Sequence, residues 1–258
     1  MLIAIDASRA FIKERTGTEN YSYQLIKAIA KLDHRNQYIL YTRFPNHPNI
    51  PNNSNEFPVN FSRKNIANRR LWTQIGLAKE MLINPPDVLF VPAHTLPIIL
   101  RPGLKTVVTI HDLGYEYLPQ YHQFPQKLYL NKSTEFAVWQ STHLIAVSEA
   151  TKKDLINKLG CPEEKITVVY EGFDKEKFKP DKSPKSLKLL KINQPYFLFV
   201  GTLQPRKNIE RLIEAFANVI LETRQSGSIE SHTRNRSYCP VSQDSRMTDN
   251  IMLLIAGN

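Results

Sequence analysis

Short apolar runs recur along the chain and alternate with longer segments whose apolar residues follow a helical period. The runs are rich in β-branched and aromatic residues, and most are apolar on both sides. This pattern is typical of strands buried on both faces of a parallel sheet. We expect strands at about residues 2–7, 38–43, 87–93, 105–112, 143–148, 165–172, 196–201 and 251–257.

The segments between these runs carry the apolar stripes or the terminal signals of helices. Ser148 is a good N-cap, and Gly160 suits the left-handed turn that ends many helices. The expected helices are 18–32, burying Leu25, Ile29 and Leu32; 66–83, burying Ala67, Leu71, Ile75, Ala78 and Leu82; 148–159; and 209–220, with Ile209, Leu212, Ile213, Phe216 and Ile220 on one face. Strands and helices in this alternation predict doubly wound α/β sheets.

The pattern breaks at residues 174–195, which are rich in lysine, hold three prolines and lack a sustained apolar period. We therefore predict a first domain over residues 1–178, a linker over 179–195 and a second domain that starts at 196–258. Residues 223–250 are polar and almost aperiodic, so we expect a disordered surface insertion in the second domain.

Composition predicts a globular cytoplasmic protein. The chain has 258 residues and 41% hydrophobic content, enough to bury a sizeable core. Its longest apolar runs are far shorter than the roughly 20 residues that span a bilayer, and Asp6 interrupts what would be a signal core. Only two cysteines occur, Cys161 and Cys239, so a disulfide scaffold and a structural zinc site lack support.

The net charge of +10 favours anionic partners, but the basic residues are spread along the chain. We expect no nucleic-acid partner, because clustered cations with interleaved aromatic residues are not evident. We also expect no metal site, because the histidines show no helical ligand pairing and the chain has no Asp-x-Asp. Arg63, Lys64, Arg69 and Arg70 could touch a membrane surface, although a solvated helix face explains them better.

The loop "VGTLQPRKN", residues 200–208, lies between an expected buried strand and an expected helix. Loops at the carboxyl ends of parallel strands bind anions through backbone amides and helix N-termini. Gly201 allows close backbone approach, while Arg206 and Lys207 together suit a diphosphate. From position alone, two solvated surface cations explain this pair equally well.

Four ordered stretches resemble retaining glycosyltransferases of family 4, formerly group 1, which have two Rossmann-like domains. They are "FLFVGTLQPRKNIERLIEAF" (197–216), "RTGTENYSYQLIKAIAKL" (15–32), "VTIHDLGYEYLPQYH" (108–122) and "LIAVSEATKKDLINKLGCPEEKITVVYEGFDKEKF" (144–178). Many members have an arginine where this sequence has Thr202. The resemblance implies an acceptor-side first domain, a nucleotide-sugar-binding second domain and a reaction that needs no metal or other cofactor.

The resemblance also implies roles for single residues. Arg206 and Lys207, with Gly201, would bind the donor diphosphate, and Gly17 and Thr18 would face the cleft between the domains. His111 would contact the transferred sugar or lie beside the acceptor, although a structural histidine is the competing interpretation, as a simple turn is for Gly17. Asp112 could orient His111 or cap a turn, and Glu171 and Gly172 lie near the cleft or only form the hinge.

The activity implied is transfer of a sugar, with retention, from a nucleotide-diphosphate sugar to a sugar or lipid-linked acceptor in polysaccharide or glycoconjugate biosynthesis. The chain stops before the family's Glu-x7-Glu segment, so we expect an incomplete second domain. The alternative is a truncated, inactive remnant or acceptor-binding module. A nucleotide-sugar epimerase of the same architecture is a weaker third possibility.

Overall fold

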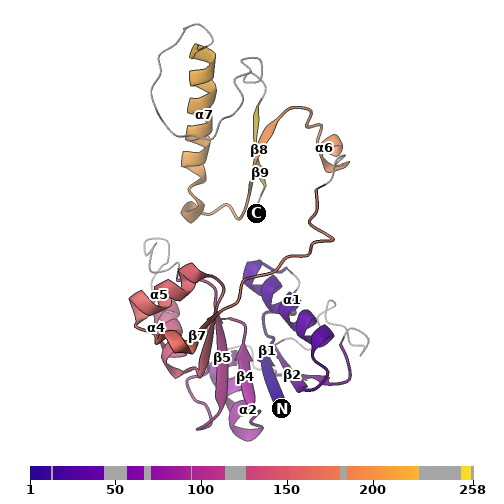
Figure 1. Cartoon of the computed structure of the whole chain (residues 1–258), viewed down its shortest axis with the longest axis vertical. Helices are drawn as coiled ribbons and strands as arrows, with labels where there is room; N and C mark the ends of the chain where they lie inside the picture. The colour runs from indigo at the N-terminus through magenta and orange to yellow at the C-terminus, as the bar shows by residue number, and fades with distance from the viewer. Residues whose placement is uncertain are drawn as a thin grey trace. The chain divides into compact units, whose positions relative to one another are not determined.

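The computed structural model describes residues 1–12, 14–43, 57–66, 71–93, 95–113, 126–180, 185–226 and 251–256. The chain divides into two compact units, Met1–Phe173 and Asp174–Asn258 (Figure 1). The unit boundary falls a few residues before the predicted domain boundary at residue 178, and the predicted linker contains a short helix.

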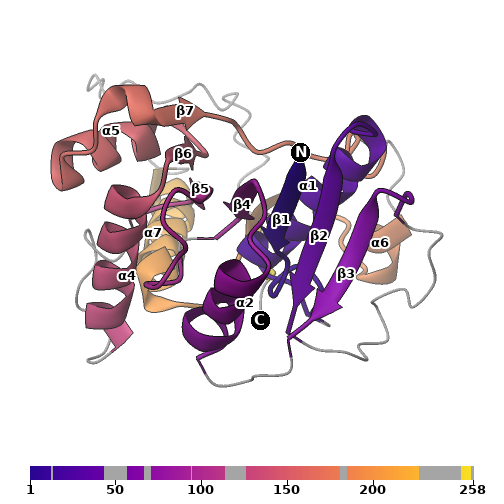
Figure 2. The ribbon, with the colours of Figure 1, turned by 90° about the horizontal axis from the view of Figure 1, so that it is seen from below.

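The first unit contains a seven-stranded, entirely parallel sheet in the order β3-β2-β1-β4-β5-β6-β7. Figure 2 shows β1 between β2 and β4 near the middle of this sheet. The strands are β1 (Leu2–Asp6), β2 (Gln37–Thr42), β3 (Phe61–Asn65), β4 (Val88–Val91), β5 (Lys105–Ile110), β6 (His143–Ala146) and β7 (Ile166–Val168). The helical elements are α1 (Gly17–Leu32), η1 (Trp72–Leu77), α2 (Ala78–Ile83), α4 (Gln126–Gln140), α5 (Glu149–Leu159) and η3 (Glu163–Lys165).

Two apolar cores lie on the two faces of this sheet. Neighbouring residues of a strand point to opposite faces, so Ala4 belongs to one core and Ile5 to the other. Ile26 of α1 packs in the core that contains Ile5, while η1, α2, α4 and α5 contribute to the core that contains Ala4. Because helices cover both faces of the sheet, residues on both sides of the central strands are buried, which explains the continuous apolar runs in the sequence.

The second unit contains a two-stranded parallel sheet and a long helix. Its elements are α6 (Lys185–Leu189), β8 (Tyr196–Val200), η4 (Pro205–Lys207), α7 (Ile209–Ser226) and β9 (Met252–Ala256). Phe216 of α7 packs edge-on against Phe197 of β8, with ring centroids 6.1 Å apart. Most of the predicted insertion, residues 227–250, lies outside the described residues.

The expected strands all form, but the sixth is shorter than predicted. β7 ends at Val168, after which only Val169 N–H still reaches the carbonyl of Ala146, at 2.9 Å. Residues 170–173 are exposed and leave the sheet. β3 was not expected, because "FSRKN" is an edge strand with several polar side chains and no apolar run.

The helix predicted over 66–83 differs most from its prediction. It is a π-helix, η1, followed by α2, and it begins at Leu71 in the left-handed region with φ of 52°. The wider turns rotate the buried face, so Trp72, Leu77 and Met81 are buried while Leu71, Ile75 and Leu82 are exposed. Of the other residues expected inside, Ala78 is buried and Ala67 lies outside the described residues.

In α1, the buried face is displaced from the predicted stripe. Ser22, Ile26 and Ala30 are buried, Leu25 and Ile29 are partly buried against the core, and Leu32 is 83% exposed at the last turn. In α7, the predicted stripe is partly buried except for Ile213. The termini predicted for α5 are confirmed: Ser148 Oγ accepts Thr151 N–H at 3.1 Å, and Gly160 is left-handed with φ of 63°.

Candidate functional site

The strand order of the first unit reverses between β1 and β4. The chain runs outward from β1 through β2 to β3, and outward on the other side from β4 to β7. Open parallel sheets bind ligands in the crevice at the carboxyl ends of the strands where the order reverses. A cavity of about 460 Å³ lies at this place, within the range of small-molecule sites.

The cavity is lined by the ends of β1, β2 and β4, by the start of α1 and by η1. Its lining residues are Asp6, Ser8, Arg9, Ile12, Glu19, Ser22, Arg43, Leu71, Trp72, Thr73, Gln74, Val91, Ala93 and Thr95. Carboxylates, guanidinium groups and hydroxyls thus surround it beside apolar side chains. Such a mixture can hydrogen-bond the hydroxyls of a polar ligand and cover its apolar faces.

Asp6 is the ionisable group of this cavity that burial perturbs most clearly. It ends β1, and its Oδ1 accepts the backbone N–H of Ser8 at 3.0 Å. Burial raises the pKa of Asp6, while the hydrogen bonds from Ser8 and the charge of Arg9 lower it by less. A desolvated carboxyl group in a cavity is a common mark of a functional site.

Arg9 and Glu19 form an ion pair at the rim, with Nη1 and Oε1 3.3 Å apart. Glu19 also closes the first turn of α1, because its Oε2 accepts the backbone N–H of Thr16 at 3.2 Å. This capping box fixes where α1 begins and therefore where the cavity wall stands. Leu71 belongs to the same wall, and its backbone is in the left-handed region. Residues other than glycine that adopt this strained conformation are found most often at functional sites.

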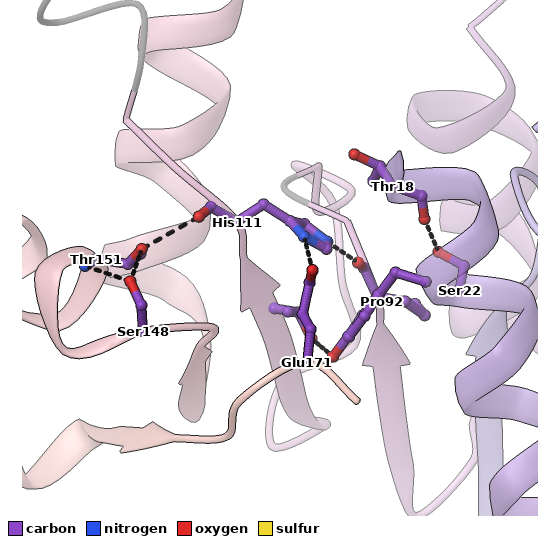
Figure 3. A network of polar contacts seen from close by, with 9 residues as sticks. Thr18, Ser22, Pro92, His111, Ser148, Thr151 and Glu171 are labelled. Atoms are coloured by element: carbon purple, nitrogen blue, oxygen red, sulfur yellow. Dashed lines mark hydrogen bonds and ion pairs between the residues drawn. The ribbon is translucent and has the colours of Figure 1, made fainter. Parts of the chain in front are cut away.

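His111 lies next to the cavity, at the carboxyl end of β5. Its ring lies between Pro92, which follows β4, and Glu171 in the segment after β7 (Figure 3): Nε2 is 3.0 Å from the carbonyl oxygen of Pro92, and Nδ1 is 3.1 Å from Glu171 Oε1. Pro92 follows β4 and separates the cavity residues Val91 and Ala93 in the sequence. The cavity and the His111 cluster therefore adjoin, and we refer to them together as the strand-end site.

Other contacts fix the backbone and the ring of His111. Thr151 Oγ1 donates to the carbonyl of His111 at 3.1 Å, and Ser148 Oγ lies 2.9 Å from that hydroxyl. The ring of Tyr21 meets the imidazole edge-to-face, with centroids 4.7 Å apart. The pKa of Tyr21 is raised by burial and, to a smaller extent, by the charge of Glu171, while a hydrogen bond with Thr109 lowers it.

Gly17 and Thr18 occupy the first turn of α1. Figure 3 shows Thr18 on the side of α1 that faces His111, and its carbonyl accepts Ser22 Oγ at 2.9 Å. A Cβ added at Gly17 would meet nothing within 4 Å. The described residues of the first unit therefore leave space for a side chain at this position, and the predicted donor contact stays a prediction.

The remaining predicted residues lie in the second unit. Gly201 follows β8 and donates its N–H to Ala256 at 2.9 Å, and a Cβ there would come within 3.3 Å of the Phe199 ring. Arg206 and Lys207 are in η4, directly before α7, and the Lys207 side chain is exposed. The side chain of Arg206 lies outside the described part of the structure.

Sequence reasoning found His111 but missed the cavity beside it. Arg43 lies far from Asp6 and Arg9 in the sequence, and the strand order brings it beside them. One signal was available: Asp6 is a charged residue at the end of an otherwise apolar strand, where burial costs free energy. Arg63 and Lys64, considered for membrane contact, bind Thr42 Oγ1 at 3.1 Å and Glu80 Oε2 at 2.6 Å.

The described residues hold neither a cluster of metal ligands nor a membrane-spanning helix. No three of their His, Cys, Asp and Glu side chains gather as metal ligands would. No helix among them is both long and apolar enough to cross a bilayer.

The sequence pattern of Glycosyltransferase Family 4 matches residues 15–177, which is more than half of the chain. The chain belongs to glycosyltransferase family 4. The match contains α1, the His111 cluster and Glu171, but it ends before the loop that carries Arg206 and Lys207.

Two curated proteins resemble part of this family 4 chain. It is 27% identical over 124 residues to the O-antigen chain mannosyltransferase B of Escherichia coli, covering 46% of the chain and 32% of that protein. It is 29% identical over 121 residues to the O-antigen chain mannosyltransferase RfbU of Salmonella typhimurium strain LT2, covering 47% of the chain and 30% of that protein. The alignments thus span about a third of each relative.

Among solved structures, HepE of Anabaena has a similar fold. Its complex with UDP-glucose aligns with a TM-score of 0.57 and 15% identity, over 100% of this chain and 69% of HepE. Its complex with UDP and glucose aligns with a TM-score of 0.53 and 18% identity, over 84% and 57%. The predicted fold class, Rossmann-like α/β units of the glycosyltransferase B type, is confirmed.

Proposed function

We propose that the protein transfers a sugar from a nucleotide-diphosphate sugar to the hydroxyl of an acceptor. The observation that supports this most is the strand-end site, where a cavity of sugar-binding size adjoins His111. His111 and most of the residues that line the cavity lie within the part that matches the family. We assign the acceptor to the first unit and the donor diphosphate to the loop at residues 200–208.

In the proposed reaction, the bond between the anomeric carbon and the diphosphate breaks as the acceptor hydroxyl attacks from the same face. The electron pair of the broken bond leaves with the diphosphate, and the hydroxyl proton leaves with it or passes to solvent. Negative charge grows on the diphosphate in the transition state, so cations at Arg206 and Lys207 would stabilise that state more than the ground state. The anomeric configuration is then retained.

The donor, the absence of a metal and the location are each proposed on a different ground. The curated relatives are named as mannosyltransferases, so we propose a hexosyl donor and would test a mannosyl donor first. The family resemblance favours a reaction without metal, so activity should survive a chelator. We propose a cytoplasmic location, with peripheral membrane contact and a lipid-linked acceptor as one form of the substrate.

The test measures release of nucleoside diphosphate and transfer of labelled sugar, with Arg206→Ala and Lys207→Ala as variants. Each variant should lose about 10- to 100-fold in kcat/KM, the factor of one charge-assisted hydrogen bond. Lys188→Ala is the matched control, because Lys188 is an exposed cation of the same unit. Unchanged turnover in both loop variants would refute the donor assignment.

Binding separates this proposal from the alternative of an acceptor-binding module. Calorimetric titration with GDP and UDP measures the donor side without requiring an acceptor. Nucleotide binding that Lys207→Ala weakens, together with transfer, supports the transferase. Failure of the unaltered chain both to bind a nucleotide and to transfer sugar would overturn it.

A further inference from the structure

The His111 cluster contains more acceptors than a neutral imidazole can satisfy. The carbonyl oxygen of Pro92 can only accept a hydrogen bond, and it lies 3.0 Å from Nε2 of His111. Nε2 must therefore carry a hydrogen. A neutral ring with its hydrogen on Nε2 has a lone pair on Nδ1.

That lone pair would face another acceptor. Glu171 Oε1 lies 3.1 Å from Nδ1, and an ionised carboxylate has no hydrogen to donate. A neutral ring beside an ionised Glu171 would place two lone pairs against each other at hydrogen-bonding distance. One further proton, shared by His111 and Glu171, removes this conflict. If the ring carries it, both ring nitrogens are protonated and the cationic imidazole donates to Pro92 and to Glu171.

The surroundings favour placing that proton on the ring. The His111 side chain is 11% exposed and its ring nitrogens lie against two oxygen atoms, whereas Glu171 is 50% exposed and in contact with solvent. Among the described residues, the charged and titratable groups near the ring include Glu171, the adjacent Asp112 and Tyr21 of α1. Burial and the charge of Glu171 both raise the pKa of Tyr21, so the Tyr21 hydroxyl stays neutral and adds no negative charge.

We propose that Glu171 is a positioning residue that holds His111 with both ring nitrogens protonated, so that His111 acts as a hydrogen-bond donor and not as a base. The role in transfer rests on the proposed function, but the protonation of the ring does not. Nε2–H is tied to Pro92 at the end of β4. Nδ1–H is therefore the group that can donate a hydrogen bond to a substrate oxygen. It does so when the half-exposed Glu171 side chain moves aside.

Glu171 lies beyond the end of β7, and its side chain is half exposed. It follows the last backbone contact of β7 with the sheet, which Val169 makes with Ala146. It belongs to the exposed residues 170–173, directly before the boundary between the two units. The same side chain thus connects the proton on His111 to the segment that leads into the second unit.

The first experiment reads the ring directly by NMR of the full chain with nitrogen-15-labelled histidine. His111→Gln assigns the signals of His111 among the seven histidines. In the unaltered protein at pH 7, both ring nitrogens should show protonated, imidazolium-type shifts. In Glu171→Gln, the amide N–H₂ can donate to the Nδ1 lone pair, so the ring should change to the neutral form protonated on Nε2.

Glu163→Gln is the matched control. Glu163 is another exposed glutamate of the first unit, paired with Lys152 at 2.8 Å, and its replacement should leave the His111 signals unchanged. A neutral His111 with an unprotonated Nδ1 in the unaltered protein would overturn the proposal. His111 signals that stay imidazolium-like in Glu171→Gln would overturn it as well.

The second experiment separates positioning from folding in the transfer assay. Glu171→Gln should lower kcat by about tenfold or more while its melting temperature stays near that of Glu163→Gln. Glu171→Asp keeps the charge and should restore part of the rate. Imidazolium shifts in a chain without transfer would leave the Glu171–His111 assignment standing and refute the transferase proposal instead, so the two failures are distinguishable.

Discussion

Single residues of the strand-end site are held by partners on other strands, and this has energetic consequences. Asp6 ends the central strand β1 with its carboxyl group in the cavity, where burial raises its pKa. A carboxyl group that is costly to ionise weakens the folded state at neutral pH. Its presence is better explained by ligand binding than by stability.

We predict that Asp6→Asn stabilises the protein at pH 7 and lowers transfer. Asparagine keeps an oxygen for the Ser8 N–H but removes the buried charge. The folded-state pKa of Asp6 is raised, so ionisation penalises the folded state above that pKa and has no effect below the unfolded value of about 3.8. The gain in unfolding free energy, measured with urea, should therefore shrink as the pH is lowered from 7 towards 4.

Asp87→Asn supplies the control for this comparison. Asp87 also accepts one backbone N–H, that of Leu2 at 2.7 Å, but it is exposed at the opposite end of β1. It should show no gain in stability and no loss of transfer. A destabilised Asp6→Asn at pH 7 would contradict the assignment of Asp6 to the site.

At the scale of elements, the helix α5 is fixed by its two ends. Its N-cap hydroxyl and its left-handed terminal glycine are both specified by local sequence. α5 packs between the strand-end site and the core, because Thr151 bonds the carbonyl of His111 and Leu155 is fully buried. Weakening either end of α5 would therefore disturb the position of His111.

We predict that Ser148→Ala lowers the unfolding free energy by about 1 kcal/mol, the usual loss for an N-cap. The variant loses the acceptor for the Thr151 N–H and one of the two partners of the Thr151 hydroxyl, which keeps its bond to the carbonyl of His111. Chemical denaturation measures the loss directly. A change smaller than the error of that measurement would mean that the cap contributes nothing.

We predict that Gly160→Ala is destabilising by about 1 kcal/mol, because an alanine in the left-handed region is strained. A Cβ at this position would meet only Trp139, at 3.9 Å, so the cost is conformational and not steric. Gly160→Asn should lose less, because asparagine tolerates this region. Gly172→Ala is the control, since its φ is not positive and its Cβ would meet nothing within 4 Å. Equal effects of alanine and asparagine at residue 160 would argue against this cause.

We predict that alkaline pH destabilises the protein through β2. Burial raises the pKa of Tyr38 and the pKa of Tyr41, each to about 12. The charge of Asp33 adds to the shift of Tyr38, and the charge of Glu80 adds to that of Tyr41. The stability from keeping them neutral is complete below the unfolded value of 10 and is lost as pH rises towards 12. Tyr41→Phe should flatten this fall in unfolding free energy between pH 10 and 12. An unchanged slope would refute the role of Tyr41.

These elements also show what the sequence alone can predict. The ends of α5 follow from Ser148 and Gly160, and the buried parallel strands follow from uninterrupted apolar runs, because both signals are local. The face of η1 does not, since a left-handed Leu71 and a π-helical turn depend on packing. The contact of His111 with Glu171 joins residues 60 positions apart, so spacing along the chain carried no sign of it.

At the scale of the whole molecule, the two units differ in how much they bury. The buried residues of both cores lie between Ala4 and Ile166, inside the first unit. In β8 of the second unit, Phe197, Leu198 and Val200 are more than half exposed. Free energy from apolar burial is therefore concentrated in the first unit.

We predict that the two units unfold separately, the second at lower denaturant. Both tryptophans, Trp72 and Trp139, belong to the first unit, so tryptophan fluorescence follows that unit. Far-ultraviolet circular dichroism also records α7 of the second unit. The dichroism should begin to change at lower urea than the fluorescence. Superimposable curves would show a single cooperative transition instead.

The strand order has a further consequence for how the protein is made. The strand-end site draws on β1 at the start of the chain and on Glu171 near the end of the first unit. During synthesis, β1 can pair with β2 early. The second wall of the cavity forms only after β4 has been made and has paired with β1. Closing such distant contacts is slow. A nascent chain released before β7 would thus hold most of the sheet and a cavity, but its histidine would lack its carboxylate.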